Sequence, residues 1–139
     1  MKILNFSEGA NLALHAMIIL STKKDELFSL SRLADILQSS DNHLSKILQR
    51  LVKSNYIKSI RGPKGGYIYS EINKEKTLLE VLEVIDGKFQ NNNCMFKRDF
   101  CIGNSCFCGE FLDGLNNNIR TYFSSYKLGD FNGKQDFLS

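Results

Sequence analysis

Residues 56–69 read Tyr-Ile-Lys-Ser-Ile-Arg-Gly-Pro-Lys-Gly-Gly-Tyr-Ile-Tyr, and this stretch decides the fold. Two runs of β-prone residues flank a Gly-Pro-Lys-Gly-Gly turn, a pattern that predicts a β-hairpin. The glycines give the tip backbone freedom, while Pro63 stiffens it. Arg61 and Lys64 should therefore project from a compact, positively charged tip.

Two short amphipathic helices are expected just before the hairpin. Residues 41–53 carry apolar side chains at i, i+3, i+4, i+7 and i+8, which form one stripe along a helix: Leu44, Ile47, Leu48, Leu51 and Val52. The opposite face holds hydrogen-bonding and cationic side chains with no acid among them: Asn42, Ser45, Lys46, Gln49, Arg50 and Lys53. Ser29 should cap the preceding helix, residues 38–41 form the turn, and Ser40 or Asp41 caps the second helix.

A polar and basic helix beside a basic hairpin predicts a winged helix-turn-helix, a shape that places a helix in the major groove of DNA. The expected fold class is mainly α with a small β-hairpin wing, followed by a long C-terminal dimerisation helix. Residues 1–76 should form the DNA-binding domain. Residues 77–139 should hold a linker helix, a cysteine-rich loop at 91–109 and the dimerisation helix.

Apolar periodicity predicts the remaining helices. The first spans 8–20 after Ser7 and turns Leu12, Ala16, Ile19 and Leu20 inward; another spans 78–85 after Thr77. The last starts near Glu110, and its apolar residues recur at steps of three and four: Leu112, Leu115, Ile119, Tyr122 and Tyr126. Such a seam favours a dimer, with packing onto its own domain as the alternative. The tail at 129–139 is expected to be loose.

Composition and charge narrow the function. A chain of 139 residues with 42% apolar and 24% charged side chains is typical of a globular protein. Residues 41–76 carry eight basic and three acidic side chains, whereas residues 77–139 carry six basic and eight acidic. Positive charge thus gathers on the segment that would face phosphate. No stretch approaches the roughly 18 apolar residues of a membrane span, and no signal peptide is recognisable, so we expect a cytoplasmic protein.

The four cysteines, Cys94, Cys101, Cys106 and Cys108, follow the spacing C-x6-C-x4-C-x-C. In a cytoplasmic chain such a cluster indicates metal ligands or redox thiols more than disulfides. Neither pair has the Cys-x-x-Cys spacing that structural zinc sites prefer. Spacing alone leaves an iron–sulfur cluster, a zinc site and a thiol switch open.

The sequence resembles the IscR/NsrR-type winged-helix regulators of the Rrf2 family over residues 2–128. The resemblance is most specific in His-Leu-Ser-Lys-Ile-Leu-Gln-Arg-Leu at 43–51 and in Ser-Ile-Arg-Gly-Pro-Lys-Gly-Gly-Tyr at 59–67. It implies a transcriptional regulator whose operator affinity is controlled by a 2Fe–2S or 4Fe–4S cluster that senses iron–sulfur status, nitric oxide or redox state. It also implies that Cys94, Cys101 and Cys106 hold the cluster.

The resemblance leaves two candidates for a fourth ligand. In the nitric-oxide-sensing branch an acidic side chain at the start of the first helix comes from the partner subunit, and Glu8 occupies that position here. In the branch that regulates iron–sulfur biogenesis, the fourth ligand is a histidine three residues after the third cysteine. In this chain that position is occupied by Gly109. Cys108 is the second candidate. His15 is expected to be a core or packing residue, and His43 to face DNA.

By resemblance, the DNA contacts of the family fall on Ser40, Asn42, Ser45, Lys46 and Arg61, and the flanking His43 and Ser59 are included in the expected face. The chemistry agrees, because Lys46 can donate to guanine acceptors and Asn42 can pair with adenine, while Arg61 suits a narrow minor groove. Arg50 and Lys64 are expected to hold phosphates. Ser45 departs from the longer acidic residue of the biogenesis regulators.

There are two alternatives to a regulator controlled by an iron–sulfur cluster. In the first, the same winged-helix regulator carries a structural zinc or thiol-switch cysteine site and no cluster. In the second, the chain is an enzyme or electron carrier with an iron–sulfur centre; no phosphate loop, activated nucleophile or catalytic carboxylate pair supports it. We expect no enzyme, no small-molecule substrate and no membrane partner. The expected partners are an operator in double-stranded DNA and a second copy bound through the C-terminal helix.

Overall fold

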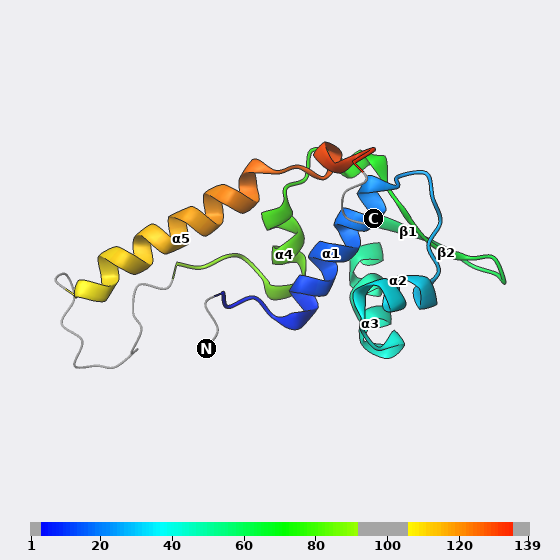
Figure 1. Cartoon of the computed structure of the whole chain (residues 1–139), viewed down its shortest axis with the longest axis horizontal. Coiled ribbons are helices and arrows are strands. Elements are labelled where there is room, and N and C mark those ends of the chain that lie inside the picture. Colours follow the sequence, from blue (N-terminus) through cyan, green and yellow to red (C-terminus); the bar gives the residue numbers. More distant parts are fainter. Residues whose placement is uncertain (1–3, 92–105, 135–139) are drawn as a thin grey trace.

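The computed structural model describes residues 4–91 and 106–134 of the chain (Figure 1). Its helices and strands follow in the order α1 (Glu8–Thr22), α2 (Leu30–Leu37), α3 (Asp41–Lys53), β1 (Ile57–Ile60), β2 (Gly66–Tyr69), η1 (Glu71–Asn73), α4 (Leu78–Asp86), α5 (Phe107–Ser125) and η3 (Leu128–Phe131). The two strands form one antiparallel hairpin. The predicted fold class, mainly α with a β-hairpin wing, is confirmed.

Helix α1 is the centre of the core. It contacts α2, α3, α4, β2 and η3. The four side chains predicted to face inward are buried, but so are residues on its other sides, including Ala10, Ala13, Met17 and Ile18. Burial on nearly every side explains why α1 is apolar almost all round rather than striped.

The helix-turn-helix begins each helix with a serine cap. The Ser29 hydroxyl accepts a hydrogen bond from the Arg32 backbone N–H at 3.1 Å, and Ser40 accepts one from the His43 backbone N–H at 3.2 Å. Such caps satisfy amide groups that have no partner within the helix. The predicted cap at Ser29 is confirmed, and Ser40 rather than Asp41 caps the recognition helix α3.

The hairpin is anchored to the segment before α2. Tyr67 and Phe28 exchange two backbone hydrogen bonds of 2.7 and 2.9 Å, which add a short third bridge to the sheet. At the tip the Gly65 N–H donates to the Gly62 carbonyl at 2.9 Å and closes the turn. A methyl group at Gly66 would lie 2.3 Å from the Phe28 carbonyl oxygen, so the close approach requires glycine.

The tail was expected to be loose from Gly129, and that prediction is wrong for the part of the tail that the structure describes. Leu128 and Phe131 are buried in the core, and the Leu128 N–H donates to the Lys76 carbonyl at 2.9 Å. Further along, the Gly133 N–H donates to the Thr22 carbonyl at 3.1 Å. Two apolar side chains with these backbone bonds hold the segment against α1.

Helix α5 forms an arm that extends away from the other helices (Figure 1). It starts at Phe107, three residues before the predicted Glu110, because Cys106 in an extended conformation acts as its N-cap and the helix accommodates Gly109 in its first turn. Within residues 4–91 and 106–134, no helix is both long and apolar enough to cross a membrane.

We expect Gly66→Ala to lower the free energy of unfolding by about 2 kcal/mol or more, because the new methyl group would push the hairpin off Phe28. Urea unfolding at one protein concentration measures the loss. Gly114→Ala is the control, since its methyl group would meet nothing within 4 Å. It should leave stability unchanged or raise it by up to about 1 kcal/mol. Equal stability of both variants would contradict the anchoring role of Gly66.

Candidate nucleic-acid interface and metal-ligand residues

The predicted recognition surface is exposed along α3. Asn42, Lys46 and Arg50 are exposed, while His43 and Ser45 are half-buried at the sides of the same face. The apolar stripe opposite them is buried as predicted: Leu44, Ile47, Leu48 and Leu51. One long face of α3 therefore presents polar and basic side chains to solvent.

The wing places its predicted residues beside that helix. Ser59 is exposed on β1 opposite Tyr67, and Arg61 and Lys64 are exposed at the tip. In Figure 1 the hairpin, α2 and α3 lie at one end of the molecule, and the start of α5 lies at the other. The structure thus brings the predicted DNA-facing residues together at one end.

Two of the three acidic side chains in residues 41–76 are paired with lysines. Glu71 lies 2.6 Å from the Lys24 ammonium, and Glu75 lies 2.7 Å from that of Lys127. The hydrogen bond and charge of each lysine lower the pKa of its carboxyl partner. Such exposed pairs add little stability, but they offset acidic charge within the basic segment 41–76. The surface keeps its positive character.

Arg50 has a structural role that the sequence did not reveal. Its guanidinium donates to the carbonyls of Val84 and Ile85 at 2.9 and 3.1 Å. These carbonyls belong to the last turn of α4, where orphan acceptors favour a cation. Arg50 therefore joins the recognition helix to α4, and its contact with phosphate stays a prediction.

The start of α1 meets the same end of α4. Asp86 accepts hydrogen bonds from the backbone N–H of Ser7, at 2.8 Å, and from the Ser7 hydroxyl. A methyl group at Gly9 would lie 2.8 Å from Ile47 of α3 and 3.4 Å from Ile85 of α4. The first turn of α1, the end of α4 and the middle of α3 thus form one packed junction. Neither periodicity nor motif pointed to Asp86 or Gly9.

The cysteine site is described only in part. Cys106 is exposed at the N-cap of α5 and Cys108 is half-buried in its first turn, whereas Cys94 and Cys101 lie outside the described residues. Glu8 is exposed in the first turn of α1. Across residues 4–91 and 106–134, no three His, Cys, Asp or Glu side chains are grouped closely enough to hold a metal ion.

His15 does not have the place predicted for it. It was expected in the core or in packing, but its side chain is exposed on α1, and its Nδ1 lies 2.7 Å from the Asn11 carbonyl. The apolar run around it suggested burial, yet position 15 falls on the side of α1 that the described elements leave exposed.

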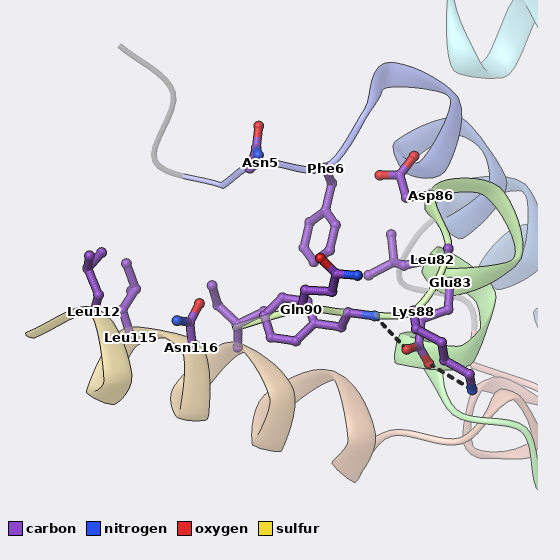
Figure 2. Close-up of a pocket in the computed structure, with 13 residues that line it drawn as sticks. Asn5, Phe6, Leu82, Glu83, Asp86, Lys88, Gln90, Leu112, Leu115 and Asn116 are labelled. Atoms are coloured by element: carbon purple, nitrogen blue, oxygen red, sulfur yellow. Dashed lines mark hydrogen bonds and ion pairs between the residues drawn. The ribbon is translucent and has the colours of Figure 1, made fainter. Parts of the chain in front are cut away.

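A cleft of about 420 Å³ separates the inner face of α5 from the rest of the chain (Figure 2). Leu112, Leu115 and Asn116 line it from α5, and Phe6 and Glu83 line it from the opposite side. The Glu83 carboxylate accepts the Phe89 backbone N–H at 2.8 Å. Part of the predicted α5 seam therefore faces its own chain across an open cleft.

Within residues 4–91 and 106–134, three aromatic side chains on the outer side of α5 are left exposed. Phe107 is 90% exposed, Phe111 60% and Tyr122 58%, and they lie on one side of the helix. The inner edge contacts the N-terminal segment, where the Phe6 and Phe123 rings meet edge to face with centroids 5.7 Å apart. The N-terminal segment thus covers part of the apolar stripe of α5.

A recognition helix and a basic wing exposed at one end of a helical core define a winged-helix transcriptional regulator. Residues 6–133 match the Rrf2 family, described as an iron-dependent transcriptional regulator. The chain belongs to the Rrf2 family. The predicted resemblance is confirmed, and the family is one of transcriptional regulators rather than enzymes.

Two curated relatives differ in how much they share with this chain. NsrR of Bacillus licheniformis, an HTH-type transcriptional regulator, is 31% identical over 146 residues, which cover 99% of this chain and 96% of NsrR. BadM of Rhodopseudomonas palustris is 37% identical over 73 residues, and the match spans only 47% of BadM. The likeness to NsrR therefore extends over nearly the whole chain, including the winged helix and α5.

A solved structure supports the fold independently. The structure of CymR (YrzC), the global cysteine regulator of B. subtilis, superposes with a TM-score of 0.76 at 21% identity. The similarity covers 96% of this chain and all of that one. At this level of identity the likeness concerns the fold alone.

We expect Arg50→Ala to lower the free energy of unfolding by about 1–2 kcal/mol, because the last carbonyls of α4 lose a charged donor. Urea unfolding measures the change. Lys53→Ala is the control; it removes an exposed cation from the same helix and should cost less than about 0.5 kcal/mol. If Arg50→Ala were as stable as the wild type but bound DNA more weakly, Arg50 would be a phosphate ligand and not a link to α4.

Proposed function

We propose that this protein is a homodimeric, cytoplasmic transcriptional regulator whose affinity for its operator is controlled by an iron–sulfur cluster. Residues 1–76 bind DNA, and residues 77–139 carry the linker helix, the cysteine-rich loop and the dimerisation helix. The observation that carries the proposal is the pairing of a polar, basic α3 face with a cysteine-bearing helix α5 whose apolar side is exposed.

The DNA contact surface consists of α3 and the wing. Asn42 and Lys46 read base edges in the major groove, since an amide suits adenine and an ammonium suits guanine. Arg61 enters the minor groove, and Lys64 holds a phosphate. Ser40, His43, Ser45 and Ser59 complete the face. The exposure of Asn42, Lys46, Arg61 and Lys64 at one end of the molecule supports this assignment.

The dimer forms through α5. A stripe with Phe107, Phe111 and Tyr122 open to solvent is costly to expose, and aromatic side chains contribute most to protein interfaces. The α5 helix of a second copy of this chain has an apolar seam of the same length and is therefore the partner. Two winged-helix units are then held at a fixed separation, as required to read half-sites about 34 Å apart.

The cluster ligands are Cys94, Cys101 and Cys106, with Glu8 of the second subunit as the fourth. Thiolates are the usual ligands of an iron–sulfur cluster. Cys106 at the N-cap of α5 and Glu8 in the first turn of α1 are both exposed. Cys108 is half-buried and is the less accessible candidate. When bound, the cluster supplies sensitivity to nitric oxide, oxidants and iron–sulfur supply.

Gain or loss of the cluster changes what Glu8 binds, and the α1–α3–α4 junction transmits this change to the DNA surface. Glu8 lies between Ser7, which is bonded to Asp86 of α4, and Gly9, which packs on Ile47 of α3. Arg50 joins α3 to the carbonyls beside Asp86. A displacement of the first turn of α1 therefore alters how α3 is held. Because both half-sites must be engaged together, a small rotation changes operator affinity.

Protein purified without oxygen should absorb visible light and contain iron and sulfide in equal amounts, with little zinc. Cys101→Ala should abolish the absorbance because it removes one of the thiolates that would hold the cluster. The visible spectrum, together with iron, sulfide and zinc analysis, measures both effects. A colourless protein that holds zinc or four free thiols would overturn the cluster in favour of the zinc or thiol-switch regulator.

The fourth ligand is tested with the same spectrum. Glu8→Ala should shift the absorbance or make the cluster labile to oxygen, whereas Cys108→Ala should leave the spectrum unchanged. Asp41→Ala is the matched control, since Asp41 is an exposed acid in the first turn of another helix. A change in Cys108→Ala and none in Glu8→Ala would assign the ligand to Cys108.

A further inference from the structure

The exposed face of α3 has a central row that the predicted contacts do not fully cover. Asn42, Lys46, Gln49 and Lys53 follow one another at steps of four, three and four residues, so they lie in line along the helix. All four are exposed, and they stand opposite the buried side of α3. Gln49 occupies the third place in this row.

Arg50 does not compete for that place. Its guanidinium is engaged with the Val84 and Ile85 carbonyls of α4, to the side of the row. In the third turn of α3, the Gln49 amide is therefore the exposed polar group that can face DNA. An uncharged amide next to Lys46 adds little to phosphate binding but is well suited to a base edge.

Ser45 constrains the amide of Gln49. The Gln49 Nε2 donates to the Ser45 hydroxyl at 3.4 Å, one turn back along the helix. A glutamine amide has two N–H donors and one carbonyl acceptor. With one donor bound to Ser45, one N–H and the carbonyl are left for another partner.

This remaining pair has the pattern that matches adenine. Adenine presents the N7 acceptor and the N6 donor in the major groove, which an amide contacts with one N–H and its carbonyl. Guanine presents two acceptors, N7 and O6, so the Gln49 carbonyl would face O6 without a proton between them. The Ser45 bond removes the second N–H that could have relieved this mismatch.

We propose that Gln49 is a specificity-determining residue of α3 that reads an adenine in the major groove, and that Ser45 is the residue that positions its amide. The inference rests on the proposed DNA-binding function. It adds a base contact beyond Asn42 and Lys46 and gives Ser45 a positioning role within the DNA contact face.

The test selects sequences from double-stranded DNA with a randomised central region, using the full-length protein. The wild type should enrich a two-fold symmetric site that contains an A·T pair read by Gln49. Gln49→Ala should enrich the same site without a preference at that pair. On the selected duplex, replacing the adenine with guanine should weaken wild-type binding about tenfold and Gln49→Ala binding by less than about twofold.

Three further variants sharpen the result. Gln49→Glu should change the preferred base from adenine to cytosine, because a carboxylate accepts from the cytosine N4 amine. Ser45→Ala should keep the site but lower the preference for adenine over guanine, since the second N–H is released. Lys53→Ala, in the same row, should weaken binding to all sequences equally and leave the selected site unchanged.

The outcomes separate this inference from the function on which it rests. If the wild type selects a site and Gln49→Ala selects the same site with its adenine preference intact, the role proposed for Gln49 is wrong. The proposed DNA-binding function would still stand. If the wild type selects no site and shows no salt-dependent affinity for DNA, the proposed DNA-binding function fails and the inference fails with it.

Discussion

The contact on which the rest of the structure depends is the approach of the first turn of α1 to α3 and α4. A glycine at position 9 leaves room for Ile47 and Ile85, and Ser7 is bonded to Asp86 at the end of α4. Interiors are close-packed and do not deform continuously, so a shift of this turn must move its neighbours. The recognition helix is one of those neighbours. A signal at the start of α1 therefore has a physical route to DNA.

Charge and exposure divide the chain into two ends with different tasks. At one end, α3 and the wing present amides and cations. At the other, α5 presents aromatic side chains and the thiols at its start. In the proposed regulator, the first set contacts a polyanion and the second set contacts a second subunit.

The sequence patterns predicted the features that depend on interactions between residues close in the chain. The serine caps, the apolar stripe of α3 and the glycine-rich wing were all foreseen because each depends on neighbours within a few residues. Contacts between distant residues were not: Arg50 binds a carbonyl 34 positions away, and η3 returns to pack in the core. His15 was misplaced because a run of apolar neighbours does not show which side of a helix stays open. Of the candidate site, the exposure of the polar and basic face of α3 was foreseen, and its contact with DNA stays a prediction. The ligand role of Cys94 and Cys101 stays a prediction, since both lie outside the described residues.

The most direct test of the account is the affinity of one preparation for one operator duplex, before and after its cluster is removed, at a fixed salt concentration. The account predicts that the two affinities differ by about tenfold or more, which is within the usual range of coupling between two sites. Equal affinities of the loaded and cluster-free dimers would contradict it. The junction of α1, α3 and α4 would then be a structural contact that transmits no signal to DNA.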